Sequence, residues 1–445
     1  MRQERRCSQS AHCRRPYGRA SRGTDKAYRY LRCRESRTIP QIRCSYFYYF
    51  VNSRNKSDRG GLQIGLTAFL VAPESAAFSP PRACHNLTNG FTRLQEVVVA
   101  EAVRCARVGV LGSGAWGLAL ARLFSNEGHD VVVWSESEQV VEHLEATRTI
   151  PLPGDPDLPA KIALTTSVEE AVAEKDVVVF VTSSRFVRSM AAAAAPYLRP
   201  DTVLVCATKG LEEGTFDTMT EVIAGEVARL RPDVEPVTVA LSGPSHAEEV
   251  AFDMPTCIVA ASHSEEAALL VQRLFSGDVL RVYTSADIHG VELCGAIKNV
   301  IALACGIARG LGFGDNSSAA LITRGLAEMR RLGTALGCDQ ETFFGLACTG
   351  DLVVTAGSLH SRNLRCGRML GEGVPVDEAV AKVGAVVEGL NALPAVLELA
   401  AHCGVEMPIC EMVDLVVSGK IAPEEATGLL MGRELKPEGP AAYEA

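Results

Sequence analysis

A strand, a glycine-rich turn and a helix follow one another in the segment that begins at Arg107, and this succession constrains the fold more than any other feature. A short apolar run leads into Gly112-Ser-Gly114-Ala-Trp-Gly117, and apolar residues then recur at helical spacing. Gly112 permits the tight turn, Gly114 lets the backbone approach a pyrophosphate, and Gly117 allows the helix to pack closely on the strand. The amide groups at the helix N-terminus then face negative phosphates. We therefore expect a dinucleotide-binding α/β domain.

Apolar runs typical of buried strands alternate with helical patterns after this loop. The predicted strands are residues 130–134, 161–164, 176–182, 202–206 and 237–241, and helices are predicted at 184–195 and 216–229. Such alternation favours a doubly wound parallel sheet. Ligands of these sheets bind beyond the carboxyl ends of the strands, so the loops 181–186, 207–212 and 242–247 are expected at the site.

Glu136 lies directly after the second predicted strand, about 20 residues beyond the glycine-rich loop. A carboxylate there accepts a hydrogen bond from an adenosine ribose 2′-hydroxyl and repels a 2′-phosphate, which favours NAD over NADP. The alternative stays open that Glu136 only begins the next helix, near the favourable end of its dipole.

From residue 285 onward the pattern becomes helical, with few strand signals. A predicted helix over 287–309 carries Gly295, Lys298 and Ala302 on one face. Small and apolar neighbours strip water from a lysine, which lowers its pKa into the range that suits acid–base catalysis on a carbonyl. Lys298 is therefore a candidate proton donor, although a solvated lysine is the commoner case on a helix. Asn316 is predicted to cap the next long helix.

Charged residues in the loops complete the candidate site. Asp351 follows Thr349-Gly350 and is a candidate to orient Lys298 or to bind substrate hydroxyls; its alternative is a helix cap. Arg362 and Asn363 pair a planar guanidinium with an amide, which suits bidentate recognition of a phosphate. Lys209 directly follows a predicted buried strand and is a candidate for contact with a phosphate or a carboxamide, the alternative being a solvated loop lysine.

Charge and composition exclude other classes. Residues 1–60 carry a net charge of +12 and the rest of the chain carries −21, so the main body is a poor nucleic-acid binder. The longest apolar run, residues 297–307, is shorter than a membrane-spanning helix and contains Lys298, so we expect no membrane span. The ten cysteines from Cys105 to Cys410 show no metal-ligand spacing, and we expect reduced thiols and no metal site.

Residues 1–104 do not continue the pattern of a folded enzyme. Their first 60 residues are rich in arginine and poor in acids, a composition found in organelle transit peptides. They lack a clear amphipathic helix, so we favour a disordered tail or a mis-started sequence over a transit peptide.

Together, these segments resemble bacterial-type NAD(P)-dependent glycerol-3-phosphate dehydrogenases. The motifs GxGxWG, ATKGLE, SGPSHAEE, GAIKNVIA, ALITRGLAEM, GDL, SRN and VVEG occur in family order between about residues 107 and 436. The resemblance implies a Rossmann-type domain over residues 105–288 and an all-helical substrate and catalytic domain over 289–436, followed by a tail of 437–445. It also implies reversible reduction of dihydroxyacetone phosphate to sn-glycerol 3-phosphate with NAD or NADP, a reaction that supplies glycerophospholipid synthesis.

The resemblance assigns roles to single residues. Lys298 falls on the family's proton acceptor of the oxidative direction. The family's substrate positions are matched by Lys209, Gly243, Ser245, Lys298, Asp351, Ser361, Arg362 and Asn363. Its cofactor positions are matched by Ala115, Trp116, Lys209, Ala247, Arg362, Val386 and Glu388, beside the Gly112, Gly114, Gly117 and Glu136 inferred above. Many members have a basic residue after the second strand, so Glu136 is a departure that puts NADP use in doubt.

Two other functions stay open from the residues alone. A related dehydrogenase could act on a 2-hydroxy acid, but the function would then not explain the SRN and ATKGLE elements. A non-catalytic NAD-sensing protein would not need the proton donor Lys298. The resemblance is also compatible with a homodimer and with a cytoplasmic location, or with a plastid or mitochondrion if the extension is a transit peptide.

Overall fold

The computed structural model describes residues 105–435, 437 and 438. The predictions for the extension of residues 1–104, and for the tail from residue 439 onward, lie outside the described residues.

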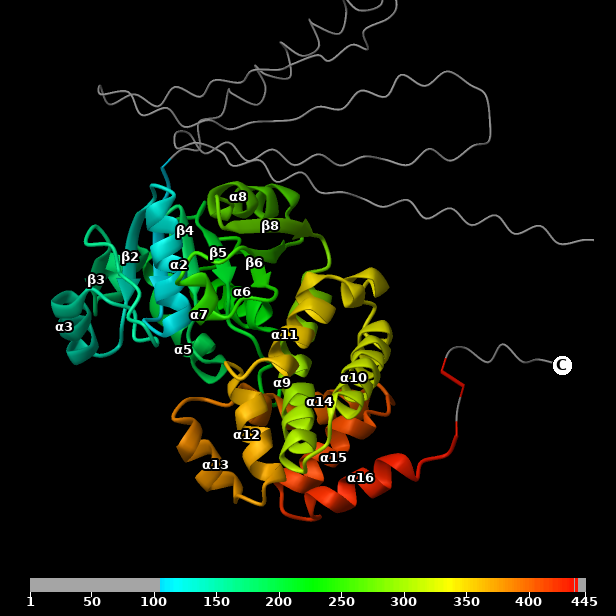
Figure 1. Cartoon of the computed structure of the whole chain (residues 1–445). Helices are drawn as coiled ribbons and strands as arrows, with labels where there is room; N and C mark the ends of the chain where they lie inside the picture. The colour runs from blue at the N-terminus through cyan, green and yellow to red at the C-terminus, as the bar shows by residue number, and fades with distance from the viewer. Residues whose placement is uncertain (1–104, 436, 439–445) are drawn as a thin grey trace, which may run out of the picture. The chain divides into compact units, whose positions relative to one another are not determined.

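One mixed sheet organises the first part of the described chain (Figure 1). Its strand order is β3-β2-β1-β4-β5-β6-β7-β8. All neighbouring strands are parallel except β6 and β7, which are antiparallel. The strands are β1 (Arg107–Leu111), β2 (Asp130–Trp134), β3 (Ala163–Thr165), β4 (Val177–Phe180), β5 (Val203–Cys206), β6 (Val237–Ser242), β7 (Thr256–Ala261) and β8 (Leu280–Ser285). The order reverses between β1 and β4, and doubly wound sheets bind ligands at such a switch point.

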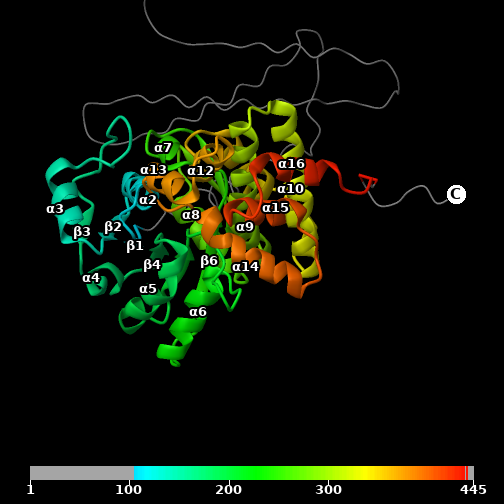
Figure 2. The same ribbon diagram turned by 90° about the horizontal axis from the view of Figure 1, so that it is seen from below.

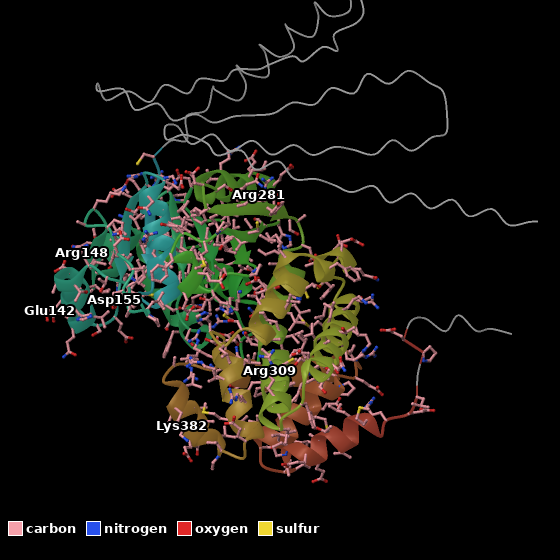
Figure 3. The ribbon with its side chains drawn as sticks, viewed as in Figure 1. Glu142, Arg148, Asp155, Arg281, Arg309 and Lys382 are labelled. Carbon is pink, nitrogen blue, oxygen red and sulfur yellow. The ribbon has the colours of Figure 1, made fainter. Side chains whose placement is uncertain are left out.

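Helices cover both faces of the sheet. One face packs against α2 (Ala115–Asn126) and α8 (Glu265–Phe275), and the other against α4 (Val168–Val172), α5 (Val187–Ala194) and α6 (Met219–Leu230). The short α3 (Glu138–Thr147) and α7 (Ala247–Val250) complete this part, with the 3₁₀ turns η2 (Ser184–Phe186) and η3 (Ala195–Tyr197) on either side of α5. Strands β4 and β5 are buried along their whole length, as expected for valine-rich strands covered on both faces. Charged side chains such as those of Glu142, Arg281 and Lys382 are exposed (Figure 3).

The second part is helical and is built around α9 (Ile288–Gly310). Figure 2 shows α9 among α10, α14 and α15, and it also contacts α11 and α12. The other elements are α10 (Asp315–Ala335), η4 (Gln340–Phe344), η5 (Leu346–Gly350), α11 (Asp351–Gly357), α12 (Arg362–Gly371), α13 (Val376–Val383), α14 (Glu388–His402), α15 (Pro408–Val417) and α16 (Pro423–Met431). The apolar residues of α9 form the centre of one core, while its first turns, through Ile288 and Val291, pack on the sheet residues Ala240 and Val259.

Glycines let the backbones of neighbouring helices approach α9. A Cβ atom on Gly306 would lie 2.4 Å from the carbonyl oxygen of Leu364, and one on Gly367 would lie 2.2 Å from that of Leu303. A Cβ atom on Gly389, in α14, would lie 2.6 Å from the carbonyl oxygen of Asn299. These close approaches bring α12 and α14, which carry candidate site residues, against the middle of α9.

Within the described residues, α9 is the single continuous helix that is long and apolar enough to cross a membrane, and its most apolar window is entirely buried. A second candidate exists only if Gln340–Gly357 and Arg362–Gly371, bent by 49°, are taken as one span. A buried core helix meets the same criteria of length and composition.

The predicted fold class, a Rossmann-type sheet followed by a helical part, is confirmed. The helix predicted over 287–309 matches α9, with Asp287 as its N-cap. Two strands, β7 and β8, were not predicted, and β7 makes the sheet mixed rather than parallel throughout. The prediction that Asn316 caps α10 is wrong, because the helix begins one residue earlier, at Asp315, with Gly314 at the N-cap. The cysteines of the described part are all free and mostly buried, in agreement with the predicted core thiols.

Candidate functional site

Two of the three glycines in the loop after β1 leave no room for a side chain. Gly112 has a φ of +135°, and a Cβ atom there would lie 2.8 Å from the carbonyl oxygen of Val181, in the loop after β4. A Cβ atom on Gly117 would lie 2.2 Å from the carbonyl oxygen of Gly112. Gly114 caps α2 without a side-chain hydrogen bond and has open space where its Cβ would be. The free amides at the start of α2, at Ala115 and Trp116, therefore fit the phosphates of a dinucleotide.

Glu136 is exposed in the turn between β2 and α3. Ser137, rather than Glu136, caps α3, and its hydroxyl accepts a hydrogen bond from the backbone N–H of Val140. The neighbouring Ser135 is buried, and its hydroxyl accepts a 2.8 Å hydrogen bond from Ser113 in the glycine-rich loop. The alternative in which Glu136 begins the helix is thus not observed, and the residue before Glu136 contacts the glycine-rich loop.

Lys298, Asp351 and Lys209 form one ionic cluster at the junction of the two parts. The carboxylate of Asp351 accepts a hydrogen bond from the ammonium of Lys298 through Oδ1 and one of 2.5 Å from Lys209 through Oδ2. Lys298 also donates to the hydroxyl of Thr355, at 2.8 Å. Lys298 and Asp351 are buried, whereas the side chain of Lys209 is 21% exposed. The cluster therefore has a buried end and an end open to a ligand.

Burial and charge set the protonation of this cluster. Burial lowers the pKa of Lys298 to about 7; the negative charge of Asp351 opposes this shift, and the positive charge of Lys209 reinforces it. Burial alone would raise the pKa of Asp351, but the ammonium groups of Lys209 and Lys298 outweigh it, so its pKa lies below the ordinary value. Near neutral pH, Asp351 is thus ionised, while Lys298 can hold or release a proton.

Local structure explains why these groups meet. Gly295 lies one turn before Lys298, and its missing side chain leaves room for Lys209, whose Cγ would be 3.3 Å from a Cβ atom there. The π-helical turn η5 leads directly into Asp351, the first residue of α11. Thr355 follows one turn later on the same face of α11, so both α11 side chains point at α9.

The loop after β6 lies against the same cluster. Gly243 has a φ of +145°, and a Cβ atom there would lie 2.9 Å from the Cα of Ile258 on β7. Its carbonyl oxygen accepts hydrogen bonds from Lys209, at 3.4 Å, and from the hydroxyl of Ser245, at 3.1 Å. Ala247 begins α7. The structure thus brings Lys209, Gly243 and Ser245 together beside Asp351.

The Ser-Arg-Asn element divides between core and surface. Ser361 is the N-cap of α12, where its hydroxyl accepts from the backbone N–H of Leu364 at 3.2 Å. Asn363 is buried; its amide donates to Asn299 Oδ1 at 3.0 Å and accepts from the backbone N–H of Gly389 at 2.9 Å. Arg362, between them, is exposed at the start of the helix. Asn363 therefore ties α12 to α9 and α14, while Arg362 faces solvent.

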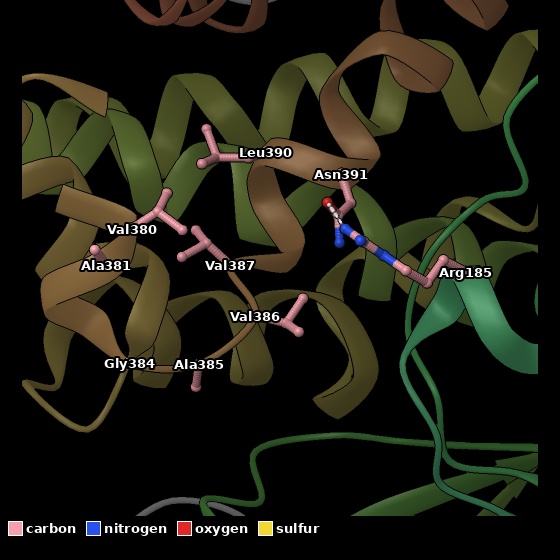
Figure 4. A pocket seen from close by; sticks show the side chains of 9 residues that line it. All are labelled: Arg185, Val380, Ala381, Gly384, Ala385, Val386, Val387, Leu390 and Asn391. Carbon is pink, nitrogen blue, oxygen red and sulfur yellow. Dashed lines mark hydrogen bonds between the residues drawn. The ribbon is translucent and has the colours of Figure 1, made fainter. Parts of the chain in front are cut away.

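Glu388, the first residue of α14, reaches the loop after β4. Its Oε1 accepts a 3.0 Å hydrogen bond from Ser183, and its Oε2 accepts one of 2.9 Å from Ser184. Nearby, Arg185 donates to Asn391 at 3.0 Å (Figure 4). Val386 lines a pocket of about 400 Å³ beside these residues. Neither Lys298 nor Asp351 lines this pocket, so it is separate from the ionic cluster.

Comparison with known proteins identifies the family. A model described as the N-terminus of NAD-dependent glycerol-3-phosphate dehydrogenase matches residues 107–268, and its C-terminal counterpart matches 287–428. A glycerol-3-phosphate dehydrogenase [NAD(P)+] of Lactobacillus delbrueckii is 49% identical over 334 residues, which are 75% of this chain and 99% of that protein.

The chain belongs to the NAD-dependent glycerol-3-phosphate dehydrogenase family.

The resemblance that the motifs indicate is thereby confirmed. A second glycerol-3-phosphate dehydrogenase [NAD(P)+], from Geobacter metallireducens, is 47% identical over 75% of this chain and 98% of its own length. Among solved structures, glycerol-3-phosphate dehydrogenase from Coxiella burnetii superposes with a TM-score of 0.70 and 34% identity, covering 74% of this chain and 99% of that one.

Three residues beside the candidate site were not predicted. Thr355 lies four residues after Asp351, and this helical spacing could have indicated it. Asn299 follows Lys298 directly, but only the fold shows that its side chain holds Asn363. His246 follows Ser245 and is partly buried, and burial lowers its pKa.

The arrangement has the groups that carbonyl reduction needs. A phosphate cradle lies at the switch point of the sheet, and a buried lysine with a pKa of about 7 lies at the junction with the helices. Such a lysine can protonate a developing alkoxide and stabilise its charge. The exposed Arg362 can hold an anionic group of the substrate.

Proposed function

We propose that the chain catalyses the reversible NAD(P)-dependent reduction of dihydroxyacetone phosphate to sn-glycerol 3-phosphate. Family membership supports the reaction, and the cluster of Lys298, Asp351 and Lys209 is the observation that supports its chemistry. The 2-hydroxy-acid and NAD-sensor alternatives are less consistent with the family models and with a buried lysine beside a phosphate cradle.

Lys298 acts as the proton donor of the reduction and the proton acceptor of the oxidation. The bound dinucleotide supplies or receives the hydride. When the substrate oxygen gains negative charge, the ammonium of Lys298 stabilises it and transfers a proton. Asp351 accepts a hydrogen bond from Lys298 and so holds its ammonium in place for catalysis. Lys209, at the open end of the cluster, is the lysine that would contact the substrate.

The substrate phosphate is held at the other end of the site. Arg362 is the main phosphate-binding group, because it is an exposed guanidinium at a helix N-terminus, where anions are also favoured by the helix dipole. Asn363 contributes the amide hydrogen that it does not share with Asn299, and Ser361 fixes the turn. Gly243 and Ser245 line the substrate from the loop after β6.

A dinucleotide would be held by residues at the carboxyl ends of the strands, between Glu136 and the ionic cluster. The cradle of Gly112, Gly114 and Gly117, with Ala115 and Trp116, holds the pyrophosphate. Glu136 accepts from the adenosine ribose and favours NAD over NADP. Further cofactor contacts come from Lys209, Ala247, Arg362, Val386 and Glu388.

The experiment that tests this function measures oxidation of NADH and of NADPH by the full-length protein with dihydroxyacetone phosphate. Rapid oxidation of NADH with little oxidation of NADPH would support both the reaction and the role of Glu136. Equal use of NADPH would keep the reaction and reject that role. No oxidation of either, with turnover of a 2-keto acid instead, would reject the proposed substrate.

Three wider properties follow from the family and are proposals only. The product would supply glycerophospholipid synthesis, the enzyme would act in the cytoplasm, and two copies would form a homodimer. The location depends on residues 1–104, which lie outside the described residues; fractionation of cells that express the full chain would test it.

A further inference from the structure

Glu388 is held by two serines that are distant in sequence. Ser183 and Ser184 belong to the loop after β4, and their hydroxyls donate to different oxygens of the carboxylate, at 3.0 and 2.9 Å. The amide of Asn391, one turn along α14, adds a longer bond of 3.4 Å to Oε2. Hydrogen bonds to both oxygens fix the rotation of the carboxylate about its last side-chain bond, which is otherwise broad.

The serines lie next to the phosphate cradle. The carbonyl oxygen of Val181 would be 2.8 Å from a Cβ atom on Gly112. The loop after β4 therefore contacts the glycine-rich loop at Val181, two residues before Ser183. On its other side, Ser184 packs against Gly210 in the loop after β5, where a Cβ atom would lie 2.7 Å from the Cβ of Ser184. The carboxylate of Glu388 is therefore held by the loop after β4, one of the two loops that flank the switch point.

A carboxylate at this position cannot serve the phosphates of a dinucleotide, because like charges repel. It can accept hydrogen bonds from neutral donors, namely ribose hydroxyls or the amide of a nicotinamide. An acceptor that is already oriented loses less side-chain entropy when such a donor arrives. A carboxylate that is already oriented therefore increases the affinity for the dinucleotide. The two serines provide this orientation.

We propose that Ser183 and Ser184 are positioning residues that orient Glu388 for the sugar or amide groups of the dinucleotide. This inference rests on the proposed function, which places the dinucleotide between the glycine-rich loop and Glu388. The serines act through Glu388, so they affect binding of NADH and leave binding of the phosphorylated substrate unchanged.

The test compares variants of the full-length protein by titration with NADH, followed through nicotinamide fluorescence. Ser183→Ala combined with Ser184→Ala should raise the Kd for NADH roughly tenfold. The KM for NADH should rise with it, while the KM for dihydroxyacetone phosphate at saturating NADH stays constant. Ser183→Thr in the Ser184→Ala background should restore part of the affinity, because threonine keeps the hydroxyl.

Arg185→Met is the matched control, because Arg185 joins the same two segments through Asn391, which makes only the longer 3.4 Å bond to Glu388. We expect its Kd for NADH to equal that of the unmodified protein. An equal loss in Arg185→Met would assign the effect to the joining of the segments and overturn the proposal. Unchanged NADH affinity in the double serine variant would also overturn it. The titration requires no turnover, so failure of the unmodified protein to reduce dihydroxyacetone phosphate would reject the proposed function separately.

Discussion

The loops of the sheet and the helices around α9 bring residues to the same site by different means. Gly112 and Gly243 are held by backbone geometry, because each has a positive φ and lies against a neighbouring strand or loop. The helical residues are held by buried side chains, since Asp351 joins Lys298 to Lys209 and Asn363 joins Asn299 to Gly389. The loop glycines are thus constrained by the backbone around them, whereas the buried helical side chains are constrained by one another.

The sharpest test of this difference is Lys298→Ala. The variant lacks the proton donor, and we expect kcat to fall by about 10³-fold or more. Affinity for NADH should persist, because the phosphate cradle belongs to the loops; NADH fluorescence would measure it. Lys420→Ala, which removes an exposed lysine paired with Asp414, should leave both quantities unchanged. Turnover by Lys298→Ala at the normal rate would exclude Lys298 from the mechanism.

The buried end of the cluster should also set the pH dependence. Burial lowers the pKa of Lys298 to about 7, so the group is protonated below that pH and neutral above it. Reduction needs the protonated form, and kcat/KM for dihydroxyacetone phosphate should fall about tenfold per pH unit as pH rises beyond about 7. Oxidation of glycerol 3-phosphate needs the neutral form of Lys298, so its kcat/KM should instead rise with pH up to about 7 and level off above it.

Asp351→Asn sharpens that pH test. The carboxylate favours the charged lysine, so its loss should move the falling limb of the reduction profile to lower pH. If kcat/KM of the variant fell at the same pH as that of the unmodified protein, a group other than Lys298 would control the profile.

The third prediction contrasts neighbours on α12. Arg362→Ala removes an exposed guanidinium, and we expect the KM for dihydroxyacetone phosphate to rise about 10- to 100-fold with little change in melting temperature. Arg365→Ala removes another exposed arginine one turn along the helix and serves as the control, with an unchanged KM. An unaltered KM in Arg362→Ala would reject the phosphate-binding role.

The fourth prediction concerns the buried neighbour. Asn363→Ala leaves Asn299 Oδ1 and the backbone N–H of Gly389 without their partner, at a cost of about 1–3 kcal/mol of unfolding free energy. Denaturant unfolding would measure this loss, with Arg362→Ala as the stable reference. If Asn363→Ala were as stable as the unmodified protein and changed only substrate binding, the contrast between core and surface on α12 would fail.

Sequence predicted the parts of the fold that local patterns specify. The glycine-rich turn, the alternating strands and α9 follow from short-range spacing. Strands β7 and β8 were missed, although α8 separates them as in the alternating pattern; β7 departs from that pattern by running antiparallel to β6. In the same way, Lys298, Asp351 and Arg362 could be named from motifs, but the contacts of Glu388 with Ser183 and of Asn363 with Asn299 join residues about 64 to 205 positions apart. No local pattern encodes such pairings.

Helix α9 packs both on the sheet and in the helical core, and this has a mechanical consequence. The helix runs for 23 residues from the sheet contacts of Ile288 and Val291 into the core of the helical part, and Lys298 lies in between. A hinge motion between the two parts would have to bend the buried helix α9. Lys298 thus lies on an element that is anchored in both parts.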